Sequence, residues 1–108
     1  MENTQSTQSA VVANAINIFS GAYAASLVDA LQEICEADSL QGVCHAIEAL
    51  SEEHRPIEAI QLIQALMDIT NIECPEELGL LEENEAGVAF VKEFVSDLED
   101  ILYSELIG

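Results

Sequence analysis

The chain has 108 residues, the size of a single domain, and half of them are apolar, which is enough to fill one core. Its 21 acidic residues outnumber the two basic ones, Arg55 and Lys92, and give a formal net charge of −19. Nucleic acids and anionic membranes are bound through Lys and Arg, so this balance argues against direct binding to either. Disordered acidic chains lack the apolar residues needed for collapse, and this chain has them.

The cysteine content indicates a reducing compartment. Cys35, Cys44 and Cys74 are an odd number without CxxC spacing, and the N-terminus has no basic and apolar signal sequence. Residues 9–28 are uncharged and about as long as a membrane span, but Asn, Ser and Gly interrupt them and no basic residue flanks them. We therefore expect no transmembrane helix and a cytoplasmic protein.

Residues 1–8 are polar and predict a flexible N-terminal tail, followed by a single all-α acidic domain over residues 9–108. From Ser9 onward, apolar residues recur three and four positions apart, which is typical of a helix. These residues are Val12, Ile16, Phe19, Leu27, Leu31 and Ile34. Ser20 and Gly21 leave open one long helix or two with a bend. The small residues 20–26 fit either a crowded core or a dimer face.

Two further helices are predicted next. Asp38 and Ser39 can cap the first of them. The residue before a proline disfavours the helical conformation, so this helix ends before Pro56, and the proline suits the first turn of the next helix. That helix should end near Thr70 and Asn71. The two apolar stripes consist of Leu40, Val43, Cys44, Ile47 and Leu50, and of Ile57, Ile60, Ile63, Leu66 and Met67.

The segment ECPEELGLLEENE, residues 73–85, carries six glutamates in thirteen positions without a basic residue. It has neither strand alternation nor a sustained helical period, and it contains Pro75 and Gly79. We expect a loop with a short helical turn. Its leucines, Leu78, Leu80 and Leu81, are expected to pack this loop onto the domain.

Residues 85–107 predict a long helix whose apolar residues keep a strict spacing of three and four. These residues are Val88, Val91, Val95, Leu98 and Leu102, widened by Phe94 and Ile101. Glu93, Asp97 and Asp100 are expected to point away from this stripe. The chain is therefore predicted to be an all-α bundle of three to four helices. The stripe could pack within the monomer or against a second copy.

Groups that could perform catalysis or hold a metal do not converge in the sequence. Cys44 and His45 are adjacent, so on a helix their side chains diverge by about 100°. His54 lies in a predicted turn. The cysteines and histidines lack paired zinc spacings, and residues 73–85 lack the order of ligands of a calcium loop. A cation among Glu82, Glu83 and Glu85 would be opportunistic. We expect no enzyme, no cofactor and no dedicated metal site.

Carboxylates occur in every segment after the first 28 residues. On a helix, residues three or four apart place carboxylates about 5 to 6 Å apart. Phosphates on one DNA strand are about 3.4 Å apart along the axis, and alternate ones about 7 Å apart. A helical acidic surface can therefore approximate a ladder of phosphates. Solubility alone needs only a modest net charge, and a solvated acidic face is the simpler alternative.

The region from about Asp38 to Leu106 resembles the Ocr-like antirestriction proteins of phages. The resemblance rests on Leu40, the segment CHAIEALSEEHRP, the acidic loop and the long acidic C-terminal helix. Ile57 and Glu58 stand where the family carries an aromatic pair. The resemblance implies a helical homodimer that copies bent duplex DNA and occupies the DNA site of type I restriction enzymes and related defence complexes. The residues that would stand in for phosphates are Glu48, Glu52, Glu53, Glu58, Glu73, Glu76, Glu77, Glu82, Glu83, Glu85, Glu93, Asp97 and Asp100.

Two hypotheses of function follow. The first is a phage-encoded DNA mimic that inhibits a host DNA-binding protein by occupying its basic groove, without binding nucleic acid or membranes. The second is an acidic helical adaptor or chaperone that binds a protein partner through an apolar helix face. A mimic should present its acids in two tracks on one elongated face, whereas an adaptor should expose a contiguous apolar patch.

Overall fold

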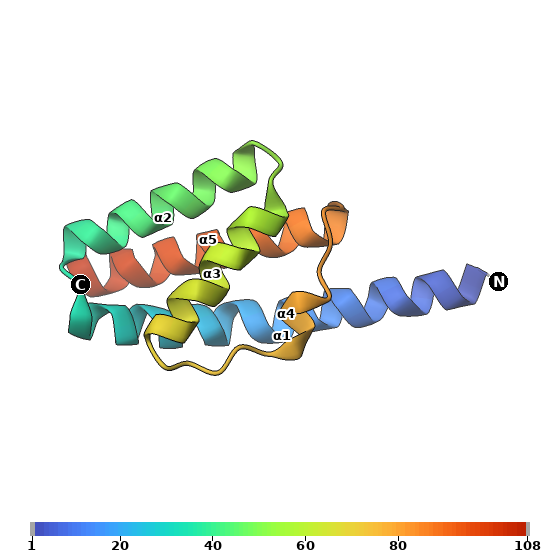
Figure 1. Cartoon of the computed structure of the whole chain (residues 1–108), viewed down its shortest axis with the longest axis horizontal. Coiled ribbons are helices and arrows are strands. Elements are labelled where there is room, and N and C mark those ends of the chain that lie inside the picture. The colour runs from blue at the N-terminus through green and yellow to red at the C-terminus, as the bar shows by residue number, and fades with distance from the viewer. Residues whose placement is uncertain (1, 108) are drawn as a thin grey trace.

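The computed structural model describes the backbone of residues 2–107 and the side chains of Ile16 and of residues 19–104. Helices account for most of this part of the chain, which contains no strand, and the predicted all-α fold is confirmed (Figure 1). The helices are α1 (Glu2–Ile34), α2 (Ala37–Glu52), α3 (Pro56–Ile69), α4 (Glu76–Gly79) and α5 (Glu85–Ile107). They form a bundle, beyond which the N-terminal part of α1 extends (Figure 1).

Helix α5 is the centre of this bundle and has contacts with α1, α2 and α3. The predicted stripe on α5 is largely confirmed, because Val91, Phe94, Val95, Leu98 and Leu102 are buried. Val88 is half-buried. The prediction missed Phe90, which is also buried. The centroid of its ring lies 5.6 Å from the centroid of the Phe94 ring. The C-terminal helix therefore packs within the monomer.

Helix α1 is continuous over 33 residues, so Ser20 and Gly21 do not divide it. Residues 2–8 belong to this helix, and the flexibility predicted for residues 1–8 stays a prediction. Within the small-residue passage, Ser20 and Ala24 are buried in the monomer. Ile34, predicted to be on the apolar stripe, is 58 % exposed. That prediction was wrong because Ile34 is the last residue of α1, where the chain turns towards α2. The side chain of Val12 lies outside the described part.

The start of α2 differs from the prediction. Glu36 is the N-cap residue, and its side chain makes no capping hydrogen bond. Asp38 and Ser39 lie inside the first turn and do not cap the helix. The backbone amide of Leu40 instead donates to the Glu36 carbonyl at 3.1 Å. Asp38 still suits this position because negative charge is stabilised near a helix N-terminus.

Helices α2 and α3 end in the same way, with a residue at positive φ. His54 has φ 59° and Asn71 has φ 62°. In each case the next amide reaches back five residues, from Arg55 to the Leu50 carbonyl and from Ile72 to the Met67 carbonyl. This is the Schellman pattern, in which Gly or Asn commonly occupies the left-handed position. The predicted end of α3 near Thr70 and Asn71 is confirmed, and His54 has a structural role in its turn.

The segment of residues 73–85 is attached to the core, as predicted, and contains the short helix α4. Leu78 and Leu81 are buried, whereas Leu80 is 73 % exposed. The prediction for Leu80 was wrong, because the turn after α4 directs adjacent residues to different sides. Cys74 adds an attachment that the sequence did not indicate, since its thiol donates to the Gln64 carbonyl of α3 at 3.6 Å.

Asn84 connects this acidic segment to α5. Its side-chain oxygen accepts hydrogen bonds from the amides of Ala86 at 3.0 Å and Gly87 at 3.1 Å. These amides have no partner within the helix, so Asn84 caps α5. We expect Asn84→Ala to lower the free energy of unfolding by about 1 kcal/mol, as measured by urea denaturation. Asn84→Asp keeps an acceptor and should retain most of the stability. Equal losses in both variants would contradict the capping role.

Candidate functional site

The thirteen acids predicted to mimic phosphates are mostly accessible to a partner. All except Glu48 and Asp97, which are half-buried, are exposed. The exposed ones are Glu52, Glu53, Glu58, Glu73, Glu76, Glu77, Glu82, Glu83, Glu85, Glu93 and Asp100. They come from α2, α3, α5 and the segment of residues 73–85, so the acidic surface is assembled from several elements.

Few of these charges are neutralised within the chain. Arg55 forms ion pairs with Glu53, at 3.5 Å, and with Glu58. Within the part of the chain that the structure describes, no other carboxylate has a basic partner within 4 Å. Lys92 is exposed and makes no such pair in that part. The acidic surface therefore meets solvent almost without compensating charge.

Asp97 differs from its expected orientation. Its carboxylate lies over Gly21 of α1, where a Cβ added to the glycine would be 3.6 Å from Asp97 Oδ2. Glu93 and Asp100 are exposed as predicted, but Asp97 lies at the border between α5 and α1. The reason is the 100° step per residue, which turns position 97 further towards α1 than position 93 or 100. Whether the acids of residues 73–85 line up with Glu93, Asp97 and Asp100 in one track stays a prediction.

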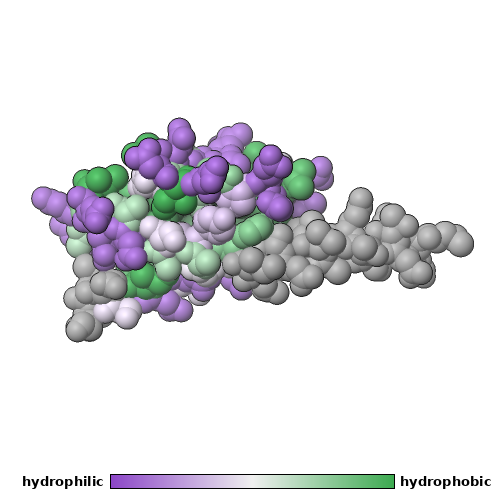
Figure 2. Space-filling model, turned by 90° about the horizontal axis from the view of Figure 1, so that it is seen from below, coloured by the Kyte–Doolittle hydropathy of each residue, from purple (hydrophilic) through white to green (hydrophobic). Residues whose placement is uncertain are grey.

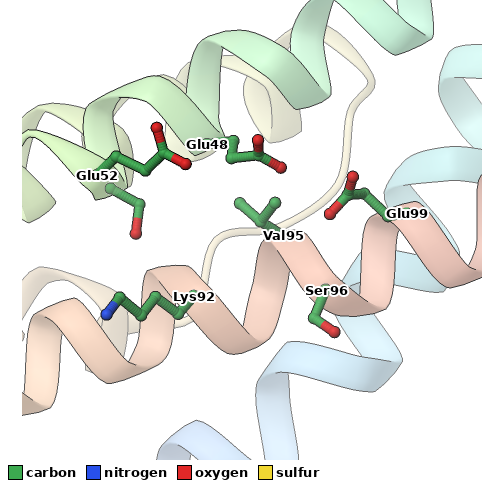
Figure 3. A pocket seen from close by; sticks show the side chains of 7 residues that line it. Glu48, Glu52, Lys92, Val95, Ser96 and Glu99 are labelled. Carbon is green, nitrogen blue, oxygen red and sulfur yellow. The ribbon is translucent and has the colours of Figure 1, made fainter.

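A cleft of about 210 Å³ lies between α2 and α5. Figure 3 shows Glu48 and Glu99 pointing towards one another from the two helices, with Glu52 one turn further along α2. Lys92 lines the same cleft, but its side chain extends away from Glu48 and Glu99 (Figure 3). The lining residues are Glu48, Ser51, Glu52, Lys92, Val95, Ser96 and Glu99.

The cleft raises the pKa of one of these carboxyl groups, that of Glu99. Burial raises the pKa of Glu99, and the charge of Glu48 and a hydrogen bond with it raise the pKa further. Asp100 acts in the same direction, whereas His45 opposes it. Because the folded state holds this proton more tightly than the unfolded chain, stability falls as the pH rises from the ordinary value of 4.5 through the raised pKa. Ionised Glu99 is therefore a cost to folding that a bound cation would reduce.

Cys44 is close enough to the same pair of carboxyl groups to be affected by their charge. Burial, followed by the charges of Glu99 and Glu48, raises the pKa of the Cys44 thiol to about 11. At neutral pH the thiol is protonated, and thiolate is the reactive form. Cys44 is thus a core residue of α2.

Five residues of the cleft were not predicted as site residues: Ser51, Lys92, Val95, Ser96 and Glu99. Ser51 is buried, and its hydroxyl has no hydrogen-bond partner. Glu48 and Glu52 are four residues apart on α2, a spacing that places two carboxylates on one face. This spacing indicates the α2 side of the cleft, and both residues belong to the predicted set. No signal in the sequence identifies Glu99 as the residue opposite them, since this depends on how α5 packs against α2.

Two further kinds of site are absent from the described residues. No group of three or more His, Cys, Asp or Glu residues is arranged to hold a metal ion in that part of the chain. None of the helices in the same part is long and apolar enough to cross a membrane.

The surface also exposes hydrophobic residues. Figure 2 shows one face on which hydrophilic residues gather in groups, with hydrophobic and neutral residues between them. Large hydrophobic side chains that are more than half exposed are Ile34, Ile69, Leu80 and Tyr103. They come from α1, α3, the turn after α4, and α5.

Comparison of the chain with protein-family models, with curated proteins and with solved structures finds no match.

Proposed function

We propose that this chain is a DNA mimic, a non-enzymatic inhibitor that occupies the basic groove of a nucleic-acid-binding defence or restriction protein. The observation that carries the proposal is the set of exposed carboxylates on α2, α5 and residues 73–85 that have no basic partner within the described chain. A basic groove adapted to phosphates would gain electrostatically from such a surface. Association would be fast and would weaken as salt screens the charges.

The cost of the charge supports the same proposal. Like charges on one small domain repel each other and destabilise the folded state. The core that opposes this repulsion is centred on α5, which is packed against three other helices. A scaffold that holds unpaired carboxylates in fixed positions can replace a rigid array of phosphates. Homodimer formation, which would lengthen that array, is part of the proposal.

Competition with DNA tests the proposal. The full chain, immobilised, is used to capture proteins from a bacterial lysate, and short duplex DNA is added to the retained partner at several salt concentrations. We expect the partner to be a DNA-binding protein that duplex DNA displaces, with weaker retention at higher salt. A partner that has no nucleic-acid function, or that DNA does not displace, would contradict the proposal.

Matched charge variants test which acids are used, as part of the same experiment. One variant replaces Glu76, Glu77, Glu82 and Glu83 with Gln. The control changes the same number of charges at exposed acids outside the predicted surface, Asp29, Glu33, Glu36 and Asp38. We expect the first variant to weaken partner binding by about tenfold or more and the control by about twofold or less. Equal weakening would mean that binding responds only to net charge.

The second candidate function is an acidic adaptor or chaperone that binds a protein through apolar residues. It is favoured by the exposure of Leu80, at 73 %, and of Ile69, at 66 %. Replacing both with Ser should leave the core intact and abolish partner capture if this function is the correct one. Under the DNA-mimic proposal the same change leaves displacement by DNA unaffected.

A further inference from the structure

We propose that the cleft between α2 and α5 binds the guanidinium group of an arginine side chain supplied by the partner protein. This inference rests on the proposed function only for the source of the arginine, a basic groove. The site itself is argued from the geometry of the cleft, and it can be tested without the partner.

The carboxyl groups of the cleft lack a cation of their own. Glu48 and Glu99 point towards each other from opposite helices (Figure 3). Each would be repelled by the ionised form of the other, and the described residues contribute no basic group within 4 Å of either. Lys92, the one basic residue that lines the cleft, extends away from this pair. A cation from outside would offset this repulsion.

Ser51 provides a second and independent indication of a ligand. It lines the cleft, is 4 % exposed, and its Oγ has no hydrogen-bond partner. Buried polar groups are nearly always paired, and an unpaired one costs free energy. The hydroxyl is therefore an unused hydrogen-bond acceptor in the wall of the cleft. An uncharged acceptor beside carboxylates is suited to a ligand that carries several N–H donors.

The shape and chemistry of the cleft favour guanidinium over a metal ion. The described acids, cysteines and histidines do not form a metal-binding group. The volume of about 210 Å³ has room for several water molecules and therefore for a planar organic cation. Guanidinium has five N–H donors in a fixed plane, so it can bind carboxylates on both sides of a cleft simultaneously. A lysine ammonium is a compact, strongly hydrated charge and would satisfy fewer of these acceptors.

Titration with small probes tests the site. The full chain, labelled with ¹⁵N, is titrated with N-acetyl-arginine amide, N-acetyl-lysine amide and N-acetyl-citrulline amide, and amide shifts are followed by NMR. Citrulline has nearly the shape of arginine without its charge. We expect saturable shifts centred on Glu48, Ser51 and Glu99 with the arginine probe, weaker binding of lysine, and none of citrulline. Arginine shifts spread evenly over all acidic segments would overturn the proposal.

Two pairs of variants make the test specific. Glu99→Gln retains a hydrogen bond to Glu48 but removes a charge from the cleft, and it should weaken arginine binding by about tenfold. Asp100→Asn removes the same charge from the exposed neighbouring position and should change affinity by less than about twofold. Identical changes in arginine affinity for the two variants would overturn the proposed arginine site.

The second pair concerns the basic residues and predicts a gain. Lys92→Met removes the positive charge that lines the cleft, so arginine should bind roughly two- to fivefold more tightly. Arg55→Gln causes the same change in net charge at the ion pairs with Glu53 and Glu58, and it should have little effect. Tighter binding cannot result from misfolding. No gain with Lys92→Met relative to Arg55→Gln would count against the cleft.

The outcomes separate this inference from the proposed function. Specific arginine binding, together with a partner that DNA does not displace, would support the arginine site and contradict the DNA-mimic proposal. Displacement of the partner by DNA, without specific arginine binding, would support the DNA-mimic proposal and contradict the arginine site.

Discussion

Replacing Phe94 with alanine is expected to lower the free energy of unfolding by about 3–5 kcal/mol. Phe94 is 0 % exposed and lies on the buried stripe of α5, the helix that contacts α1, α2 and α3. Its ring also packs against that of Phe90. Truncation would leave a cavity at the point where the helices meet, because surrounding side chains relax only in part. The free energy is measured by urea denaturation followed by circular dichroism.

Tyr103→Ala is the matched control for Phe94. It removes an aromatic ring from the same helix, at a position that is 65 % exposed, and should change stability by less than about 1 kcal/mol. A loss of stability below about 1 kcal/mol for Phe94→Ala would contradict the central position of α5. Similar losses for the two variants would show that helix propensity, and not burial, determines the effect.

Gly87→Ala is expected to destabilise the protein by about 1–3 kcal/mol, although alanine is the better helix former. A Cβ at position 87 would lie 2.2 Å from the Glu82 carbonyl oxygen, which belongs to the backbone and cannot rotate away. The substitution would push the acidic segment off the start of α5 and strain the hydrogen bond from Gly87 to Asn84. Thermal or urea unfolding gives the change in stability.

Gly42→Ala should have the opposite effect and raise the free energy of unfolding. Gly42 is exposed within α2, and a Cβ there would meet nothing within 4 Å. Alanine should therefore stabilise the helix by roughly 0.5–1 kcal/mol. Stabilisation by both substitutions would mean that the Glu82 backbone does not pass over Gly87. Destabilisation by both would mean that α2 cannot accept a side chain at this position.

Much of the fold could be predicted from periodicity. The residues of α3 and α5 with a spacing of three and four are mostly buried, and Pro56 begins α3 as predicted. These properties are local, because the spacing of apolar residues and the preferences of proline act within one or two turns. Most of the errors lie at the ends of elements, and the exception is Phe90, a buried residue inside α5 that was missed. Ile34 and Leu80 are exposed where a helix or turn ends, and the predicted cap at Asp38 and Ser39 lies inside α2.

The candidate site could be predicted only in part. That the acids are exposed follows from their positions opposite the apolar stripes, and Glu93 and Asp100 are exposed as expected. Asp97 is half-buried against α1, and Glu99, which was not predicted as a site residue, lines the cleft with Glu48. Whether an acid at the edge of a stripe meets solvent or another helix depends on the neighbouring helix, and its position is not encoded locally.

The sequence by itself determined an all-α fold, a net charge of −19 without basic partners for most acids, and an acidic segment tied to the core by leucines. These follow from composition and from spacing along one helix at a time. Only the tertiary structure decided that Glu48 and Glu99 face each other, that Ser51 lines the same cleft without a hydrogen-bond partner, and that Cys74 anchors the acidic segment. The physical reason is that such contacts join residues distant in sequence, and their geometry exists only once α2, α3 and α5 pack together.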